Sequence, residues 1–304
     1  MNIPLCVPHL KGKEQEYLRS CIESNWVSSA GPFVERFEHD LALRLCSPHA
    51  VATCSGTAAL HIALLVAGVQ PDDEVLVPSL SFIAPVNAVR YAGAWPVFMD
   101  ADPRYWQMDP EGVRRFLETA CRRQGETVRN QRTGRRVRAI LPVHLLGHPA
   151  QMDALLHLAL EHHLTVIEDA AEGLGALQTG RLAGTFGDIA CLSFNGNKLI
   201  TAGGGGMILT AREEWARRAR HLTTQARVSP EEFRHDEIGY NYRLSNLQAA
   251  LGCAQLQQLD EHIEAKRCIA DRYRKAFEAI PGLVPMPEAT WARSTFWMYT
   301  ILVN

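Results

Sequence analysis

The 304-residue sequence lacks several features that would point to particular classes of protein. Its charge is nearly balanced, with 31 Lys and Arg against 33 Asp and Glu, which argues against a nucleic-acid-binding surface. The longest apolar run, near residues 58–69, is shorter than the roughly 20 residues that cross a bilayer. The first residues lack the charged and apolar regions of a signal peptide. We therefore expect a cytoplasmic protein that binds neither nucleic acid nor membrane.

Common catalytic and metal-binding motifs are also missing. The eight cysteines contain no C-x2-C pair and lie mostly in apolar segments, so we expect reduced, buried thiols. H-E-x-x-H, G-x-S-x-G, the P-loop and the dinucleotide fingerprint are absent. His144 and His148 are four residues apart, but Gly147 and Pro149 would break any helix that aligned them on a metal. The sequence predicts no metal site and gives no support to an oxidoreductase.

Short β-branched runs alternate with longer segments of helical period after a helical segment at 1–45 that breaks near 25–32. This alternation predicts an α/β domain over 46–243, with a mostly parallel central sheet and helices on both faces. The expected strands are 50–53, 74–77, 95–99, 137–142, 164–168, 189–194 and 207–209. The expected helices are 57–67, 83–91, 110–120, 152–163 and 212–224.

The pattern changes after Tyr242. Apolar residues at helical spacing predict one long linking helix over 244–280, which Pro281 and Gly282 would end. Residues 281–304 close on an apolar run that resembles the start of a strand, with no partner strand downstream. We therefore expect the chain to stop inside a truncated small C-terminal α+β domain.

Seven arginines lie between Arg122 and Arg138. We expect a solvated hairpin around Thr133 and Gly134. An anion patch for a phosphorylated ligand or a partner chain is the sharper interpretation.

Four segments could carry chemistry. Residues 54–59 place small residues between a strand and a helix, where backbone amides can bind an anion, although Ser and Thr there are commonly simple caps. Asp169 follows a buried strand at the edge where α/β sheets bind ligands; alternatively, it caps the next segment. Lys198 follows another strand and precedes four glycines, a tract in which the backbone can pass close to a ligand. The ordinary interpretation of a single lysine is a solvated surface group. Residues 238–243 form an aromatic segment before the long helix, or an ordinary turn.

In this order, the four segments resemble the DegT/DnrJ/StrS family of sugar aminotransferases, which are pyridoxal-phosphate (PLP) enzymes of fold type I. The resemblance runs from Asn25-Trp26-Val27-Ser28 past Gln255 and includes Pro142-Val143-His144. Residues 194–198, the following glycines and the 137–149 stretch resemble the LegC-like branch, which makes 4-amino sugars for bacillosamine or legionaminic acid. Family members are several tens of residues longer, which also suggests a truncation.

The resemblance gives individual residues roles as expectations. Lys198 would attach to PLP and move the proton during transfer, and Asp169 would hold the protonated ring nitrogen. Phe82 would stack on the ring. The cofactor-binding set implied by the resemblance is Gly56, Thr57, Phe82, Asp169, Glu172, Ser193, Asn195, Lys198 and, from the second subunit, Asn241. Glu172 stands where many relatives have glutamine and would contact the cofactor or the sugar.

The implied reaction transfers the amino group of L-glutamate to the 4-keto carbon of a UDP-linked 4-keto-6-deoxy-N-acetylhexosamine, for bacterial surface glycans or glycoproteins. The shared sites of the family imply a homodimer. A dehydratase of the same family would carry histidine in place of Lys198, so that alternative is disfavoured. A non-catalytic or weakly active PLP-binding scaffold, built on a truncated enzyme, remains the alternative from another class.

Overall fold

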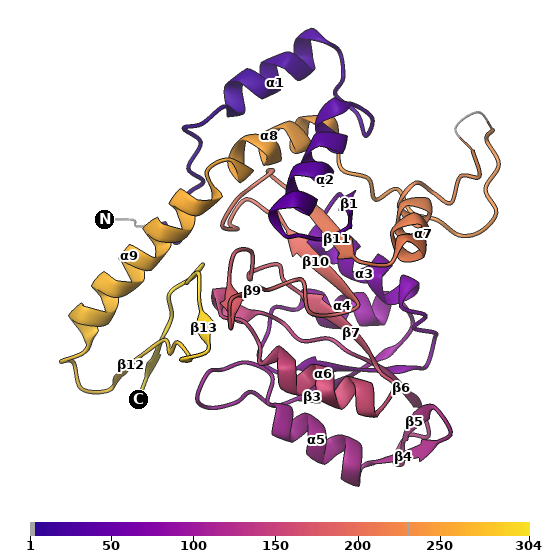
Figure 1. The fold of residues 1–304 in the computed structure, drawn as a ribbon, viewed down its shortest axis with the longest axis vertical. Helices are drawn as coiled ribbons and strands as arrows, with labels where there is room; N and C mark the ends of the chain where they lie inside the picture. Colours follow the sequence, from indigo (N-terminus) through magenta and orange to yellow (C-terminus); the bar gives the residue numbers. More distant parts are fainter. Residues whose placement is uncertain (1–3, 230–231) are drawn as a thin grey trace.

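The fold is organised around a nine-stranded sheet, seen in the computed structural model, which describes residues 4–229 and 232–304 (Figure 1). The main strand order is β1-β11-β10-β7-β6-β2-β3. The bounds are β1 His49–Thr53, β2 Glu74–Pro78, β3 Trp95–Met99, β6 Arg136–Ile140, β7 Thr165–Asp169, β10 Ile189–Ser193 and β11 Gly206–Thr210. Neighbours from β10 to β3 pair in parallel, whereas β11 is antiparallel to both β1 and β10. The predicted mostly parallel sheet is confirmed.

Side chains of the strands alternate between two apolar layers. Ile208 packs in one layer, whereas Met207 and Leu209 pack in the other, as the two-residue period of a strand requires. Helices cover both layers (Figure 1): α3 (Gly56–Val66) and α4 (Ala84–Tyr91) lie on one face, and α2 (Pro32–Arg44), α6 (Met152–Glu161) and α8 (Asn246–Leu256) on the other. Because both faces are buried, the central strands read as nearly continuous apolar runs in the sequence.

The helices expected in the α/β region are all present. Their bounds are α3 Gly56–Val66, α4 Ala84–Tyr91, α5 Pro110–Thr119, α6 Met152–Glu161 and α7 Glu213–Thr223. The first 45 residues contain α1 Glu14–Glu23 and α2 Pro32–Arg44, which matches the helical segment with a break. Among the described residues, no helix is both long and apolar enough to span a membrane. The division of the chain into domains stays a prediction.

The arginine-rich segment forms strands β4 Cys121–Gln124 and β5 Thr127–Asn130, which extend the sheet from β6. The turn between β5 and β6 contains Thr133 and Gly134, as expected. Arg136 lies against the carboxylate of Asp73 at 2.5 Å, and Arg138 donates to the carbonyl of Ala67. These two guanidiniums hold the β5–β6 region against the turn that leads into β2.

Two expectations for the end of the chain are wrong. The single helix over 244–280 is two helices, α8 Asn246–Leu256 and α9 Leu259–Phe277, separated by Gln257 and Gln258. The terminal strand has a partner, because β14 Ile301–Val303 pairs antiparallel with β12 Leu283–Pro285. Between them, β13 Ala292–Arg293 pairs with β8 Leu177–Gln178, which also pairs with β9 Arg181–Leu182 (Figure 1). The apolar run at the C-terminus therefore pairs with residues that precede it in the sequence, not with residues downstream.

Leu41 and Leu43 lie on the same helix, α2, in opposite environments. Leu41 is 0% exposed in the core beneath α8, whereas Leu43 is 65% exposed. We expect Leu41→Ala to lower the free energy of unfolding by about 2–5 kcal/mol, because it leaves a cavity in a packed layer. Leu43→Ala should change it by less than about 0.5 kcal/mol. Urea unfolding followed by circular dichroism measures both values, and equal losses would contradict the assigned packing.

Candidate active site

The carboxyl ends of β1, β7 and β10 open into a cavity of about 290 Å³. This is the edge at which open α/β sheets bind ligands. Of the residues predicted from the sequence, those that line it are Gly56, Thr57, Phe82, Asp169, Glu172, Ser193, Asn195 and Lys198. Segments that are up to 142 residues apart in the sequence, from Gly56 to Lys198, therefore meet in one cavity.

One wall of the cavity is the N-terminus of α3. Ser55 caps this helix, because its side-chain oxygen accepts from the amide of Ala58 at 3.0 Å. The first amides of a helix have no partner within the helix and carry a partial positive charge. A Cβ on Gly56 would lie 2.7 Å from the Cβ of Ser193, so glycine allows β10 to approach this helix end. The arrangement provides an anion site with the Ser193 hydroxyl beside it.

Asp169 forms the floor of the cavity. It ends β7, is 4% exposed, and accepts from the amide of Ala171 through Oδ1 at 3.0 Å. Burial raises the pKa of this carboxyl to about 6, and the Ala171 amide and the nearby Lys198 oppose the rise. A carboxylate placed this way would be stabilised by a cationic ligand atom.

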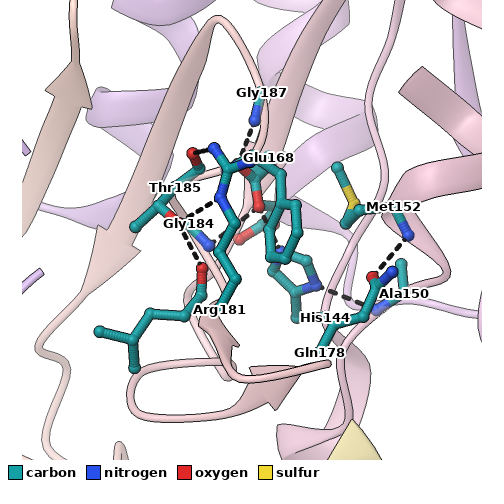
Figure 2. Close-up of polar contacts among 12 residues, drawn as sticks. His144, Ala150, Met152, Glu168, Gln178, Arg181, Gly184, Thr185 and Gly187 are labelled. Atoms are coloured by element: carbon teal, nitrogen blue, oxygen red, sulfur yellow. Dashed lines mark hydrogen bonds and ion pairs between the residues drawn. The ribbon is translucent and has the colours of Figure 1, made fainter. Parts of the chain in front are cut away.

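The residue before Asp169 anchors the strand end. Glu168 Oε1 accepts from the amides of Phe186 and Gly187, and its Oε2 accepts from the amide of Gly184 and faces His144 Nε2 at 2.8 Å (Figure 2). The Nδ1 of His144 accepts from the amide of Ala150, so this nitrogen carries no proton and Nε2 donates to Glu168. Four donors therefore satisfy an ionised carboxylate in the protein interior.

Both histidines of the His144–His148 pair are engaged in structural hydrogen bonds. His148 pairs with the carbonyl of Pro149 through Nδ1 and accepts from the amide of Ala289 through Nε2. His144 therefore connects the loop after β6 to Glu168 of β7, whereas His148 connects the same region to the segment at Ala289. In the segment Pro142-Val143-His144, which the sequence singled out, His144 therefore holds the loop after β6 in place, and Val143 lines the cavity.

Lys198 reaches the cavity from the loop after β10. Its Nζ lies 3.3 Å from Glu172 Oε1 and 4.2 Å from the centre of the Trp297 ring. The other oxygen of Glu172 accepts from the amide of Leu146 at 2.7 Å, which fixes the carboxylate. The side chain of Lys198 is thus partly buried between a carboxylate and an aromatic face, and the solvated-lysine interpretation is wrong.

Trp297 is a cavity residue that the sequence analysis missed. It lies in the apolar run near the C-terminus, which resembles the start of a strand in the sequence. No local pattern distinguishes a site tryptophan from a core tryptophan in such a run. Ser81, next to Phe82, also lines the cavity.

Asn241 does not line this cavity among the described residues. It is exposed in the short segment between Tyr240 and Tyr242, where it forms an isolated bridge with Thr224. Its expected contribution to the site of a second subunit stays a prediction.

We predict that Asp169→Asn removes a pH dependence from the stability of the ligand-free protein. Because the pKa of Asp169 is raised from 3.8 to about 6, its protonated form stabilises the folded state at low pH. That contribution is lost as the pH rises through about 6. As the pH rises from about 4 to about 8, the free energy of unfolding of the wild type should fall by about 3 kcal/mol relative to that of the Asp169→Asn variant.

Urea unfolding at several pH values measures this shift, with the exposed Asp153→Asn as a matched control. A wild-type pH profile that is parallel to the Asp169→Asn profile would contradict the assignment of a raised pKa.

Comparison with known proteins identifies the family. The sequence profile of the DegT/DnrJ/EryC1/StrS aminotransferase family matches residues 8–304. GDP-perosamine synthase of Escherichia coli O157:H7 is 41% identical over 99% of this chain and 78% of its own length. EpsN of Bacillus subtilis (strain 168), described as a candidate pyridoxal phosphate-dependent aminotransferase, is 41% identical over 100% of this chain and 76% of its own.

The fold agrees with this match. The crystal structure of S. venezuelae DesV in complex with a ketimine intermediate superposes with a TM-score of 0.86 and 33% identity. It covers 96% of this chain, which in turn covers 74% of DesV. The resemblance stated from the sequence is confirmed at the level of the family, whereas the LegC-like branch stays a prediction. The chain belongs to the DegT/DnrJ/EryC1/StrS aminotransferase family.

Proposed function

We propose that this protein is a PLP-dependent aminotransferase that moves the amino group of L-glutamate to the 4-keto carbon of a nucleotide-linked sugar. The observation that carries the proposal is one cavity that combines a helix N-terminus, a buried carboxyl and a partly buried lysine. An aminotransferase family and a curated relative named for a sugar-nucleotide product support it.

The cavity fits PLP in three separate ways. The start of α3, with Gly56, Thr57 and Ser193, suits its phosphate, because the first amides of a helix lack partners within the helix and all three residues line the cavity. Asp169 suits its ring nitrogen, and Phe82 offers an aromatic face. When bound, PLP supplies an electron sink that stabilises negative charge on the reacting carbon.

The residues of the chain would then divide the work. Asp169 would hold a proton on the ring nitrogen through a charge-assisted hydrogen bond. Lys198 Nζ would remove the proton from the α-carbon of glutamate and, in the second half, place a proton on C4 of the sugar. Glu172, 3.3 Å from Nζ, would orient the amine. Asn195, which lines the cavity, would contact the ligand.

We infer a UDP-linked 4-keto-6-deoxy-N-acetylhexosamine as the sugar substrate, from the LegC-like resemblance of residues 194–198 and 137–149. A GDP-linked keto sugar is the second candidate, because the E. coli relative is named for a GDP-linked product. The protein would act on either substrate in the biosynthesis of surface glycans.

We predict that the protein with bound PLP shows a visible absorption band that L-glutamate shifts to that of the aminated cofactor. Lys198→Ala should slow this half-reaction by about 10²–10⁴-fold, because a positioned acid–base group is lost. Stopped-flow spectroscopy measures the rate. Lys275→Ala, at an exposed lysine of α9, is the control and should react at the wild-type rate.

The second half-reaction is measured with the aminated protein and either the UDP-linked or the GDP-linked keto sugar. Steady-state kinetics with both substrates should follow a ping-pong pattern, since one site serves both halves. A sequential pattern would count against the proposal. A PLP band that glutamate leaves unchanged would favour a non-catalytic scaffold.

The active unit would be a homodimer with shared sites. Leu80, Phe82 and Ile83 are exposed apolar side chains in a single chain, and Phe82 also lines the cavity. Clustered exposed apolar groups of this kind are typical of protein interfaces. The exposed Asn241 would reach the phosphate site of the second subunit.

Mixing two inactive variants tests the shared site. In the proposed dimer each site takes Lys198 from one subunit and Asn241 from the other. Lys198→Ala therefore removes the lysine from a subunit's own site, whereas Asn241→Ala removes the residue that the subunit contributes to its partner's site. After joint refolding at equal amounts, mixed dimers should contain one intact site and restore about a quarter of the wild-type activity. Each variant alone should remain impaired. Absence of any restoration, despite dimers by sedimentation, would contradict a shared site.

A further inference from the structure

The indole of Trp297 reaches the loop that carries Lys198 at two points. Its Nε1 donates to the carbonyl of Asn197 at 2.8 Å, and its ring centre lies 4.2 Å from the Nζ of Lys198. The Trp297 side chain is 4% exposed, so the ring is held in place by packing. The first contact fixes the backbone just before the lysine, and the second covers its amine with an aromatic face.

The segment that carries Trp297 is itself pinned to the turn at Gly147. The Gly147 carbonyl accepts from the amide of Thr295 and from the hydroxyl of Ser294, each at 2.9 Å. A Cβ at Gly147 would lie 2.7 Å from the backbone nitrogen of Trp297, so only glycine permits this approach. The backbone of Phe296 takes a left-handed conformation, with φ of 47°, just before Trp297.

The same turn also holds the other side of the lysine. Leu146 precedes Gly147 and donates its amide to Glu172, whose other oxygen lies 3.3 Å from the Lys198 amine. The turn at Leu146 and Gly147 therefore controls the carboxylate on one side of the amine and the indole on the other. The sulfur of Cys6 is a second, weaker donor to Asn197, at 3.5 Å.

We propose that Trp297 is a positioning residue for Lys198: it clamps the lysine loop through Asn197 and shields the amine with its ring. Its effect on the reaction rests on the proposed aminotransferase function, in which the position of Nζ sets the rate of proton transfer. The clamp itself is a property of the cofactor-free protein and can be measured without PLP.

The test compares how fast an amine-acylating reagent labels Lys198 in the cofactor-free protein, with exposed Lys275 as the internal reference. Mass spectrometry of peptides gives both rates. Trp297→Leu removes the ring and the N–H donor, and should speed labelling of Lys198 about threefold to tenfold relative to Lys275. Trp297→Phe keeps a ring over the amine and should restore most of the protection.

Trp291→Leu is the matched control. Trp291 lies in the same segment, but its ring contacts Tyr105 and His148. This variant should label Lys198 at the wild-type rate. Labelling at the wild-type rate in Trp297→Leu, or equal acceleration in both leucine variants, would overturn the proposal.

A second readout covers the case in which Trp297→Leu does not fold. Trp297→Phe lacks the N–H donor to Asn197, so amide hydrogen exchange in residues 195–198 should become about threefold to tenfold faster. Unchanged exchange there would overturn the clamp. PLP titration of the same variants should show weaker binding than wild type. If wild-type protein binds no PLP, the proposed function fails, whereas labelling and exchange still decide the role of Trp297.

Discussion

The site depends on one buried anion, the carboxylate of Glu168. An ionised carboxylate in a protein interior is tolerated only when donors surround it, and here three backbone amides and the neutral His144 do so. These donors come from the loop after β9 and the loop after β6, so one charge ties two connections to the end of β7. The next residue is Asp169. The hydrogen bonds that stabilise the charge of Glu168 therefore also fix the position of Asp169 at the floor of the cavity.

The lysine side of the cavity is built by a different principle. Lys198 sits on a loop, and loops position side chains less accurately than strands do. The chain compensates by placing contacts on both sides of the amine, Glu172 and Trp297, and by tying both to the turn at Gly147. Contacts therefore connect the turn at residues 145–147 with Glu172, Lys198 and Trp297, although these residues are far apart in the sequence.

The sequence predicted the α/β region well because strand and helix periods are local signals. Each central strand buries both faces, so runs such as residues 164–168 stand out from the amphipathic helices between them. The same pattern, together with the family resemblance, predicted that Asp169 and Lys198 lie at the site, and both line the cavity. Their roles in catalysis remain predictions.

What escaped prediction depends on contacts distant in sequence. Trp297 joins the cavity only because β13 pairs with β8 and because glycine stands at position 147. The break between α8 and α9 has a similar cause. Apolar residues keep a helical period across Gln257 and Gln258, so the pattern predicts one helix. In the structure these two side chains, at the end of α8, donate hydrogen bonds to Tyr17 and Glu14 of α1. Local periodicity cannot report where such a tertiary contact stops.

The charges of the cavity favour a ligand with both a cationic and an anionic end. Asp169 and Glu172 are two carboxyls near one amine, and Glu172 contributes to raising the pKa of Asp169. A cationic ring nitrogen at Asp169 would reverse that rise, because it stabilises the ionised carboxylate. The anionic end would meet the amides of α3 across the cavity. Such a ligand would offset the free-energy cost of burying the ionised carboxylate of Asp169. Because it binds only the folded protein, it would also stabilise the fold.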